Sequence, residues 1–284
     1  ANAAAIAMGH PPADMVKFYR DSGCEIFGER YQPPGFVGAA LKMLCRVPLL
    51  GTLIYKLENL FFPKWDNNGL KNALTRYFGP QTCLEDVPGD RKLLITSMEL
   101  SGHLPDFNKS VVLPISMTNF RDDCQKEMKL HEAVLRSMSA PTFFESHGNC
   151  VDGGMFAQNP CIAALSAAVA HESGDVAFDQ FRMISIGTGI TDSAIRAPKP
   201  LRWGILQWAK QAFLSSAVAV VEFDSFQAQD LMGKNFCRLN IALPHPFALD
   251  DCQQLAELES IARQAVATDE FKRAVEFIRR EMLA

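Results

Sequence analysis

The segment of residues 151–160, V-D-G-G-M-F-A-Q-N-P, constrains the fold of this chain more than any other stretch. It places an acid, Asp152, in a glycine turn between an apolar strand and a helix. Gly153 and Gly154 allow other backbone to approach the turn closely. A carboxylate at such a strand end is typical of a general base in α/β enzymes. The alternative is a structural corner, in which the Asp side chain only accepts hydrogen bonds from backbone N–H groups.

The residues after this turn predict a helix. Asn159 is a good N-cap, Pro160 suits the first helical position, and residues 161–170 are rich in alanine without a breaker. Elsewhere, strand-like and helix-like segments alternate, which predicts an α/β fold with a mainly parallel sheet covered on both faces. The expected strands are 92–98, 110–115, 149–151 and 182–186, and the expected helices are 1–8 (ending at Gly9), 12–23, 69–78, 130–138, 161–170, 203–230 and 250–282.

Composition excludes several classes of protein. With 284 residues, 48% of them hydrophobic, and a net charge of -4, the chain can bury a sizeable core, but it lacks the basic face that nucleic acids require. The eight cysteines are scattered without a C-x-x-C pair or a nearby histidine at ligand spacing, so no metal site is expected. Such scatter favours reduced thiols and a cytoplasmic location. The apolar runs are shorter than the ~18 to 20 residues that span a bilayer.

Five segments of the chain, in the same order, resemble the patatin-like phospholipase family, and together they extend over most of its length. Residues 151–160 match the D-G-G/A motif of that family and its following N-N-P, with Gln158 in place of the first Asn. Residues 135–144, L-R-S-M-S-A-P-T-F-F, are similar to its A-T-S-A-A-P-T-Y-F element. The other matches are residues 1–27, at the helix that follows the family's nucleophile, residues 68–87, before a strand, and residues 184–189, I-S-I-G-T-G, at a strand end.

The resemblance implies a three-layer α/β/α fold in a single domain over residues 1–284. It also implies a serine lipid acyl hydrolase that uses a Ser-Asp dyad, without histidine and without a cofactor, on phospholipids or other acyl esters. Asp152 would accept the proton of the serine, with Gly153 and Gly154 forming the motif turn. Because Asp is a weak base in solution, with a pKa near ~3.9, apolar neighbours such as Val151, Met155 and Phe156 would have to raise its pKa.

The chain departs from the family in one respect, because no G-x-S-x-G occurs in it. Residues 1–8 read as a helix already in progress, so we expect the domain to be incomplete at its N-terminus, with the nucleophile, the oxyanion loop and at least one strand upstream of Ala1. Ser101, Ser139 and Ser185 lack the strand-turn-helix elbow that exposes a nucleophile. A triad with His147 is an alternative.

Two stretches have the composition of lipid-contacting segments. Residues 36–62 mix long apolar runs with three basic residues, and Gly38, Pro48 and Gly51 interrupt them, which suits a lid or an acyl-chain funnel. Residues 196–213 combine four basic residues with Trp203 and Trp208, as expected at an anionic membrane surface. Ordinary core-packing helices with exposed basic residues are the alternative.

Three functions follow from these observations. The first is a lipid acyl hydrolase of the phospholipase A type that works at a peripheral membrane surface. The second is a lipid-binding regulatory pseudoenzyme, in which the Asp turn is only architecture. The third is a nucleotide-binding α/β domain that uses the G-T-G turn of Gly187 and Gly189, although this motif lacks a third glycine or a P-loop lysine. The sequence leaves the oligomeric state open.

Overall fold

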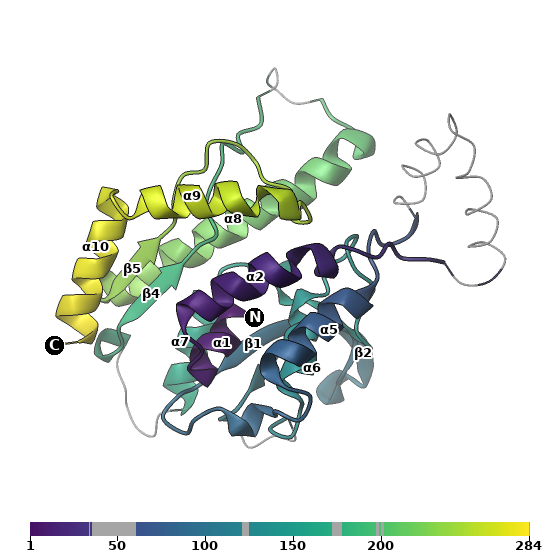
Figure 1. Cartoon of the computed structure of the whole chain (residues 1–284), viewed down its shortest axis with the longest axis horizontal. Coiled ribbons are helices and arrows are strands. Elements are labelled where there is room, and N and C mark those ends of the chain that lie inside the picture. Colours follow the sequence, from purple (N-terminus) through teal and green to yellow (C-terminus); the bar gives the residue numbers. More distant parts are fainter. Residues whose placement is uncertain are drawn as a thin grey trace. The chain divides into compact units, whose positions relative to one another are not determined.

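A computed structural model describes residues 1–33, 35, 61–120, 125–171, 178–196, 199 and 202–283 of the chain (Figure 1). The chain divides into two compact units, Ala1–Gly154 and Met155–Ala284. The expected lid segment, residues 36–62, lies outside the described residues except for its last two.

The sheet of the first unit has three strands in the order β2-β1-β3, and every neighbouring pair is antiparallel. Strand β1 is Leu94–Leu104, β2 is Lys109–Thr118 and β3 is Cys150–Asp152. Leu94 at the start of β1 pairs with Thr118 at the end of β2, and the register of the two strands shifts at a bulge between Glu99 and Gly102. The prediction of a mainly parallel sheet is therefore wrong for this unit.

The short connection between β1 and β2 explains the difference. It consists of the 3₁₀ turn Pro105–Phe107 and Asn108, whose φ is 47°. A connection of this length can join only antiparallel neighbours, because a parallel pair needs a long crossover. The crossover expected from the sequence does exist, since β2 and β3 flank helix α6 (Leu130–Met138) and run in the same direction. Strand β1 lies between them, however, so they do not pair with each other.

Four helices form the core of the first unit together with this sheet. They are α1 (Asn2–Met8), α2 (Pro12–Ile26), α5 (Asn67–Phe78) and α6. Helix α1 ends at Gly9 in the left-handed conformation, with a φ of 80°, as the sequence predicts. Helix α5 begins after Asp66, whose side chain accepts a hydrogen bond from the Asn68 N–H. The largest fully buried side chains of this core are Leu70, Leu74, Leu84, Met117, Leu130, Val134 and Leu135.

The second unit contains a parallel pair of strands, as predicted. Strand β4 (Met183–Ile186) and strand β5 (Phe236–Leu239) are joined through the long helix α8 (Ile205–Met232). The expected helix 250–282 is divided into α9 (Leu255–Ala265), α10 (Asp269–Phe277) and a final π-helical turn, Ile278–Met282. The division falls at Thr268, whose hydroxyl accepts a hydrogen bond from the Phe271 N–H and so caps α10. The core contains Cys161, Leu165, Ala228, Met232 and Phe236.

Helix α7 (Cys161–His171) begins at the first residue of the expected range 161–170, but Pro160, predicted as the first helical residue, lies just before it. The Ala164 N–H donates to the Pro160 carbonyl over 2.8 Å, so Pro160 occupies the N-cap position expected for Asn159. The amide of Asn159 is buried and bonds elsewhere. Further 3₁₀ turns lie at Leu84–Asp86, Gly153–Met155, Phe178–Gln180, Gly233–Asn235 and Cys252–Gln254.

The expectation of reduced thiols is wrong for two cysteines. Cys24 and Cys252 are each disulfide-bonded, whereas Cys83, Cys150, Cys161 and Cys237 are free. Linear spacing did not indicate this, because folding decides which thiols come close. The argument for a reducing compartment therefore loses this part of its support. Within the described residues, none of the helices has the length and apolar character needed to cross a bilayer.

Candidate functional site

The structure places Asp152 at the last position of β3, opposite Ser97 of β1. Its backbone N–H donates to the Ser139 carbonyl over 3.1 Å. Ser139 follows the end of α6 and belongs to the S-A-P-T segment that resembles a family element. The fold thus brings two of the matched motifs into direct contact. Val151 is buried beside Asp152, and the Ser97 hydroxyl donates to its carbonyl over 2.7 Å.

The two glycines after Asp152 have different surroundings. A Cβ atom on Gly153 would lie 2.3 Å from the Thr96 carbonyl oxygen, so this position has no room for any side chain. A Cβ atom on Gly154 would lie 3.3 Å from both carboxylate oxygens of Asp152, which is tight but not prohibitive. The Gly154 N–H donates to Oδ1 of Asp152 over 2.8 Å. The turn therefore orients the carboxylate through the Gly154 N–H and packs Gly153 against Thr96 of β1.

The Asp152 carboxyl group has a raised pKa. Burial raises it, because a low-dielectric environment disfavours the charged form. The hydrogen bond from Gly154 and the positive charge of the Ala1 amino group act in the opposite direction but do not cancel the effect of burial. A carboxylate with a raised pKa is a better proton acceptor than a solvated Asp, as a general base requires.

The start of the described chain lies within electrostatic reach of Asp152. Burial lowers the pKa of the Ala1 amino group to about 6, and the Asp152 carboxylate acts to raise it. Helix α1 buries Ala4, Ala5 and Ala7 in the core, where small side chains allow close packing. The residues alone gave no signal for this neighbourhood of Ala1 and Asp152. Only the resemblance, which placed α1 directly after the family's nucleophile, implied it.

The three serines weighed as internal nucleophiles all use their hydroxyl groups in hydrogen bonds. Ser139 is fully buried and donates to the Leu135 carbonyl. Ser101 donates to the side chain of Asn149. Ser185 is buried and donates to Oδ1 of Asn159 over 2.9 Å. None of these arrangements presents a free hydroxyl to a substrate.

His147 pairs with Glu132 instead of completing a triad. Its Nε2 makes a short contact with Oε2 of Glu132, near the start of α6. The Lys71 ammonium lies 3.5 Å from the other oxygen of Glu132. Burial acts to raise the pKa of Glu132, but the hydrogen bond with His147 and the charges of His147, Lys71 and His131 lower it. Glu132 could not be predicted from the sequence, because its separation of 15 residues from His147 corresponds to no recognisable motif.

The G-T-G turn after β4 does not form a phosphate cradle. The Gly187 N–H donates to the Leu239 carbonyl over 2.8 Å, and the Gly189 N–H donates to Oδ1 of Asn240 over 2.9 Å. A nucleotide site would need these donors for phosphate oxygens. In this turn both N–H groups are instead hydrogen-bonded to residues at the end of β5, which disfavours the nucleotide-binding hypothesis.

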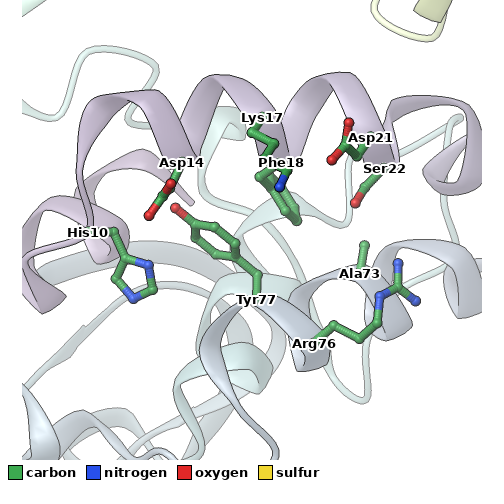
Figure 2. Close-up of a pocket in the computed structure, with 9 residues that line it drawn as sticks. All are labelled: His10, Asp14, Lys17, Phe18, Asp21, Ser22, Ala73, Arg76 and Tyr77. Carbon is green, nitrogen blue, oxygen red and sulfur yellow. The ribbon is translucent and has the colours of Figure 1, made fainter.

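A cavity of about 530 Å³ lies between α2 and α5, away from the Asp turn (Figure 2). The Tyr77 ring lies between those of His10 and Phe18 in tilted contacts, with ring centroids 4.8 and 4.6 Å away. Its rim carries both signs of charge, from Asp14, Lys17, Asp21 and Arg76, and Arg76 is paired with Glu25. Asp152 is not among the residues that line it. This cavity therefore does not supply a substrate pocket for Asp152.

Comparison with known proteins agrees with the motifs around Asp152. The sequence model of the patatin-like phospholipase family matches residues 1–165, which include α1 and the Asp turn. Patatin-like protein 1 of Arabidopsis thaliana is 26% identical over 219 residues, which cover 69% of this chain and 47% of that protein. The cGAMP-activated phospholipase of Vibrio cholerae is 27% identical over 236 residues, 74% of this chain and 63% of that protein.

A third relative, the probable inactive patatin-3-Kuras 1 of Solanum tuberosum, is 24% identical over 69% of this chain and 49% of that protein. The matched region thus spans roughly half to two thirds of the length of these relatives. Because the family model covers more than half of the chain, including both motifs that meet at Asp152, the chain belongs to the patatin-like phospholipase family.

Proposed function

We propose that the protein is a lipid acyl hydrolase of the phospholipase A type, in which Asp152 accepts the proton of a serine from a segment that precedes Ala1. Family membership supports lipid ester hydrolysis in general. The observation that carries the finer assignment is the position of the Asp152 carboxylate. It is partly buried, has a raised pKa, and interacts with Ala1, which immediately precedes α1, the helix that follows the nucleophile in the family.

The chemistry then runs in two steps. The serine oxygen attacks the ester carbonyl carbon while its proton moves to Asp152, and the resulting oxyanion needs N–H donors from elsewhere in the protein. When the C–O bond of the ester breaks, the proton on Asp152 passes to the departing alcohol oxygen, and an acyl-serine remains. Water next attacks this acyl-serine and gives its proton to Asp152, and that proton returns to the serine oxygen as the fatty acid leaves.

The raised pKa of Asp152 serves both directions of this proton transfer. A strongly acidic carboxyl group would accept the proton of a serine poorly, and a fully neutral one could not accept it at all. The N–H of Gly154 keeps one carboxylate oxygen oriented, so Oδ2 remains as the acceptor for the serine. No histidine is required for these steps, which agrees with the pairing of His147 with Glu132.

The test uses the protein from the full coding sequence, including the residues before Ala1. We expect a fluorophosphonate probe to label one serine in that segment and vesicle phospholipid to be hydrolysed. Asp152→Asn should lower kcat by about 10²- to 10⁴-fold, the usual contribution of a general base. Asp106→Asn, which changes an exposed Asp in the β1–β2 turn, is the matched control and should retain activity. Full activity of the Asp152→Asn variant would refute the assignment.

A lipid-binding protein without catalysis is the second candidate, and one relative named as probably inactive supports it. In that case the Asp turn would serve only to hold β3 against β1. The same probe distinguishes the two candidates. A protein that binds phospholipid vesicles but shows no labelled serine and no fatty acid release would be the pseudoenzyme.

A further inference from the structure

One face of α8, the long pale-green helix of Figure 1, is exposed and carries no charge. We call this surface the α8 face. Its exposed side chains follow each other at helical spacing of three or four residues, and over this length a helix extends roughly 30 Å. The residues of the α8 face are Ile205, Trp208, Ala212, Ser216, Ala219, Phe223 and Phe226.

The large side chains of the α8 face are unusually exposed for a helix of this composition. Phe223 and Phe226 are 60% and 63% exposed, and Ile205 is 86% exposed. A groove of about 610 Å³ follows the carboxyl-terminal half, lined by Ser216, Ala219, Val220, Glu222, Phe223 and Phe226. The opposite side of α8 already packs in the core through Ala228 and Met232. A helix that is apolar on both sides leaves one side in need of an apolar partner.

The amino end of the α8 face has the side chains of a membrane interface. Trp203 and Trp208 form an edge-to-face pair with ring centroids 5.3 Å apart. Lys199 and Arg202 are exposed just before the helix, whereas the nearby Arg196 is paired with Asp192. Tryptophan beside lysine and arginine is typical of surfaces that contact anionic lipid headgroups. The acidic residues of α8 are not part of the α8 face: Glu222 lies at the edge of the groove, Asp224 is half-buried, and Asp230 lies beyond the last residue of the face.

We infer that the α8 face is a docking surface for an anionic lipid bilayer, into which Phe223, Phe226 and Trp208 insert while Lys199 and Arg202 contact the headgroups. This inference deepens the proposed function, on which it rests for the substrate that the membrane would supply. It extends the prediction of lipid contact for residues 196–213 to the exposed carboxyl-terminal half of α8.

The experiment measures binding of the full-length protein to vesicles by flotation, with equal parts of phosphatidylcholine and phosphatidylglycerol or with phosphatidylcholine alone. We expect the double variant Phe223→Ser, Phe226→Ser to partition roughly tenfold or more less strongly into both kinds of vesicle, since two large apolar groups are lost. Phe107→Ser is the matched control, because Phe107 is 70% exposed but lies on the β1–β2 turn. It should bind as the unaltered protein does.

The basic residues are tested separately. Lys199→Gln with Arg202→Gln should weaken binding to the anionic vesicles about fivefold for each charge, and should not affect binding to the neutral ones. Lys272→Gln with Arg273→Gln, which removes two exposed charges from α10, is the control. Raising the salt concentration should abolish the difference between the two kinds of vesicle.

Two further readouts keep this inference separate from the proposed function. Asp152→Asn should bind vesicles normally, and the Phe223→Ser, Phe226→Ser variant should still hydrolyse a short, soluble ester. Unchanged vesicle binding by that double variant would overturn the docking surface and leave the hydrolase intact. A change of its oligomeric mass without loss of vesicle binding would also overturn it, and would show that the α8 face joins two copies of the chain.

Discussion

The two glycines that follow Asp152 look equivalent in sequence, but the space around them differs. We expect Gly153→Ala to lower the free energy of unfolding by about 1–3 kcal/mol, because its Cβ would overlap the Thr96 carbonyl of β1. Gly154→Ala should change it by less than about 1 kcal/mol, since the Asp152 carboxylate can yield slightly and alanine restricts the unfolded chain. Urea unfolding of both variants checks this. Equal losses would contradict the described turn.

Asp152 itself is expected to reduce the stability of the folded protein at neutral pH. Burial raises its folded pKa above the unfolded value, so the charge that it carries at pH 7 is less favourable in the fold than in water. Asp152→Asn keeps an oxygen for the Gly154 N–H and removes that charge. Its melting temperature should therefore equal or exceed that of the unaltered protein near pH 7, and the difference should shrink as pH falls through the Asp152 pKa. A clear loss of stability would indicate that the carboxylate is structural.

Glu132 provides the opposite case in the same unit. Its pKa is lowered, since the hydrogen bond and charge of His147, with Lys71, outweigh burial. A lowered folded pKa contributes stability above the unfolded value near 4.5, and this contribution disappears as pH falls through the lower folded pKa. Glu132→Gln should therefore lower the free energy of unfolding by about 1 kcal/mol at pH 7. It should have no effect at a pH where Glu132 is protonated in both the folded and the unfolded protein. The contrast with Asp152→Asn controls for general effects of removing a negative charge.

At the scale of elements, Asn159 is at the centre of a hydrogen-bond network that links α7, α8, β4 and β5 in the second unit. It lies just before α7, donates to the Ser225 hydroxyl of α8 over 2.9 Å, and accepts from Ser185 of β4. Arg238 of β5 donates to the same Ser185 hydroxyl over 2.8 Å. All of this replaces the simple helix cap that the sequence predicted.

Removal of the Asn159 amide should therefore reduce the stability of the folded protein. Asn159→Ala removes the acceptor of the Ser185 hydroxyl and a donor to the Ser225 hydroxyl, both of which are buried, and we expect a loss of about 2 kcal/mol in the free energy of unfolding. Asn149→Ala is the control, because Asn149 is exposed and its side chain bonds to Ser101 and Glu99, which lie outside the second unit. That variant should remain within about 0.5 kcal/mol of the unaltered protein. Similar losses for both would show that the buried network contributes nothing special.

The sequence predicted elements well where the signal is local. Helix α6 has the predicted bounds, and Gly9 ends α1 as expected, since hydrophobic spacing and glycine caps act within a few residues. Prediction from the sequence failed where contacts between residues that are distant in the chain determine the structure. The pairing of β1 with both β2 and β3, the buried partners of Asn159 and the oxidation of Cys24 and Cys252 all depend on which segments folding brings together.

At the scale of the whole molecule, family membership establishes the three-layer α/β/α fold class that the motifs implied. The candidate site was predictable only in part. The residues alone gave Asp152 and its two glycines as a turn with an acid, which equally suits a structural corner. The neighbourhood of Ala1 and the raised pKa come from three-dimensional packing, which desolvates the carboxyl group and brings the two ends of the 1–154 unit together.

The pH dependence of the whole enzyme tests this assembly. Asp152 must be ionised to accept the serine proton, so kcat/KM should fall about tenfold per pH unit below the Asp152 pKa. Because burial raises that pKa, the midpoint of the acid limb should lie above the usual Asp value of 3.8. In a chain that continues before Ala1, the Ala1 nitrogen is an uncharged amide, so this contribution to lowering the Asp152 pKa is absent.

The profile also decides between a dyad and a triad. Measured on a substrate without titrating groups, His147→Gln should leave the midpoint of the acid limb unchanged, because His147 pairs with Glu132. If His147 were the base of a triad, His147→Gln would instead abolish the activity, and the acid limb with it. An acid limb at or below the ordinary Asp pKa would show that the buried carboxylate at the end of β3 is not the base.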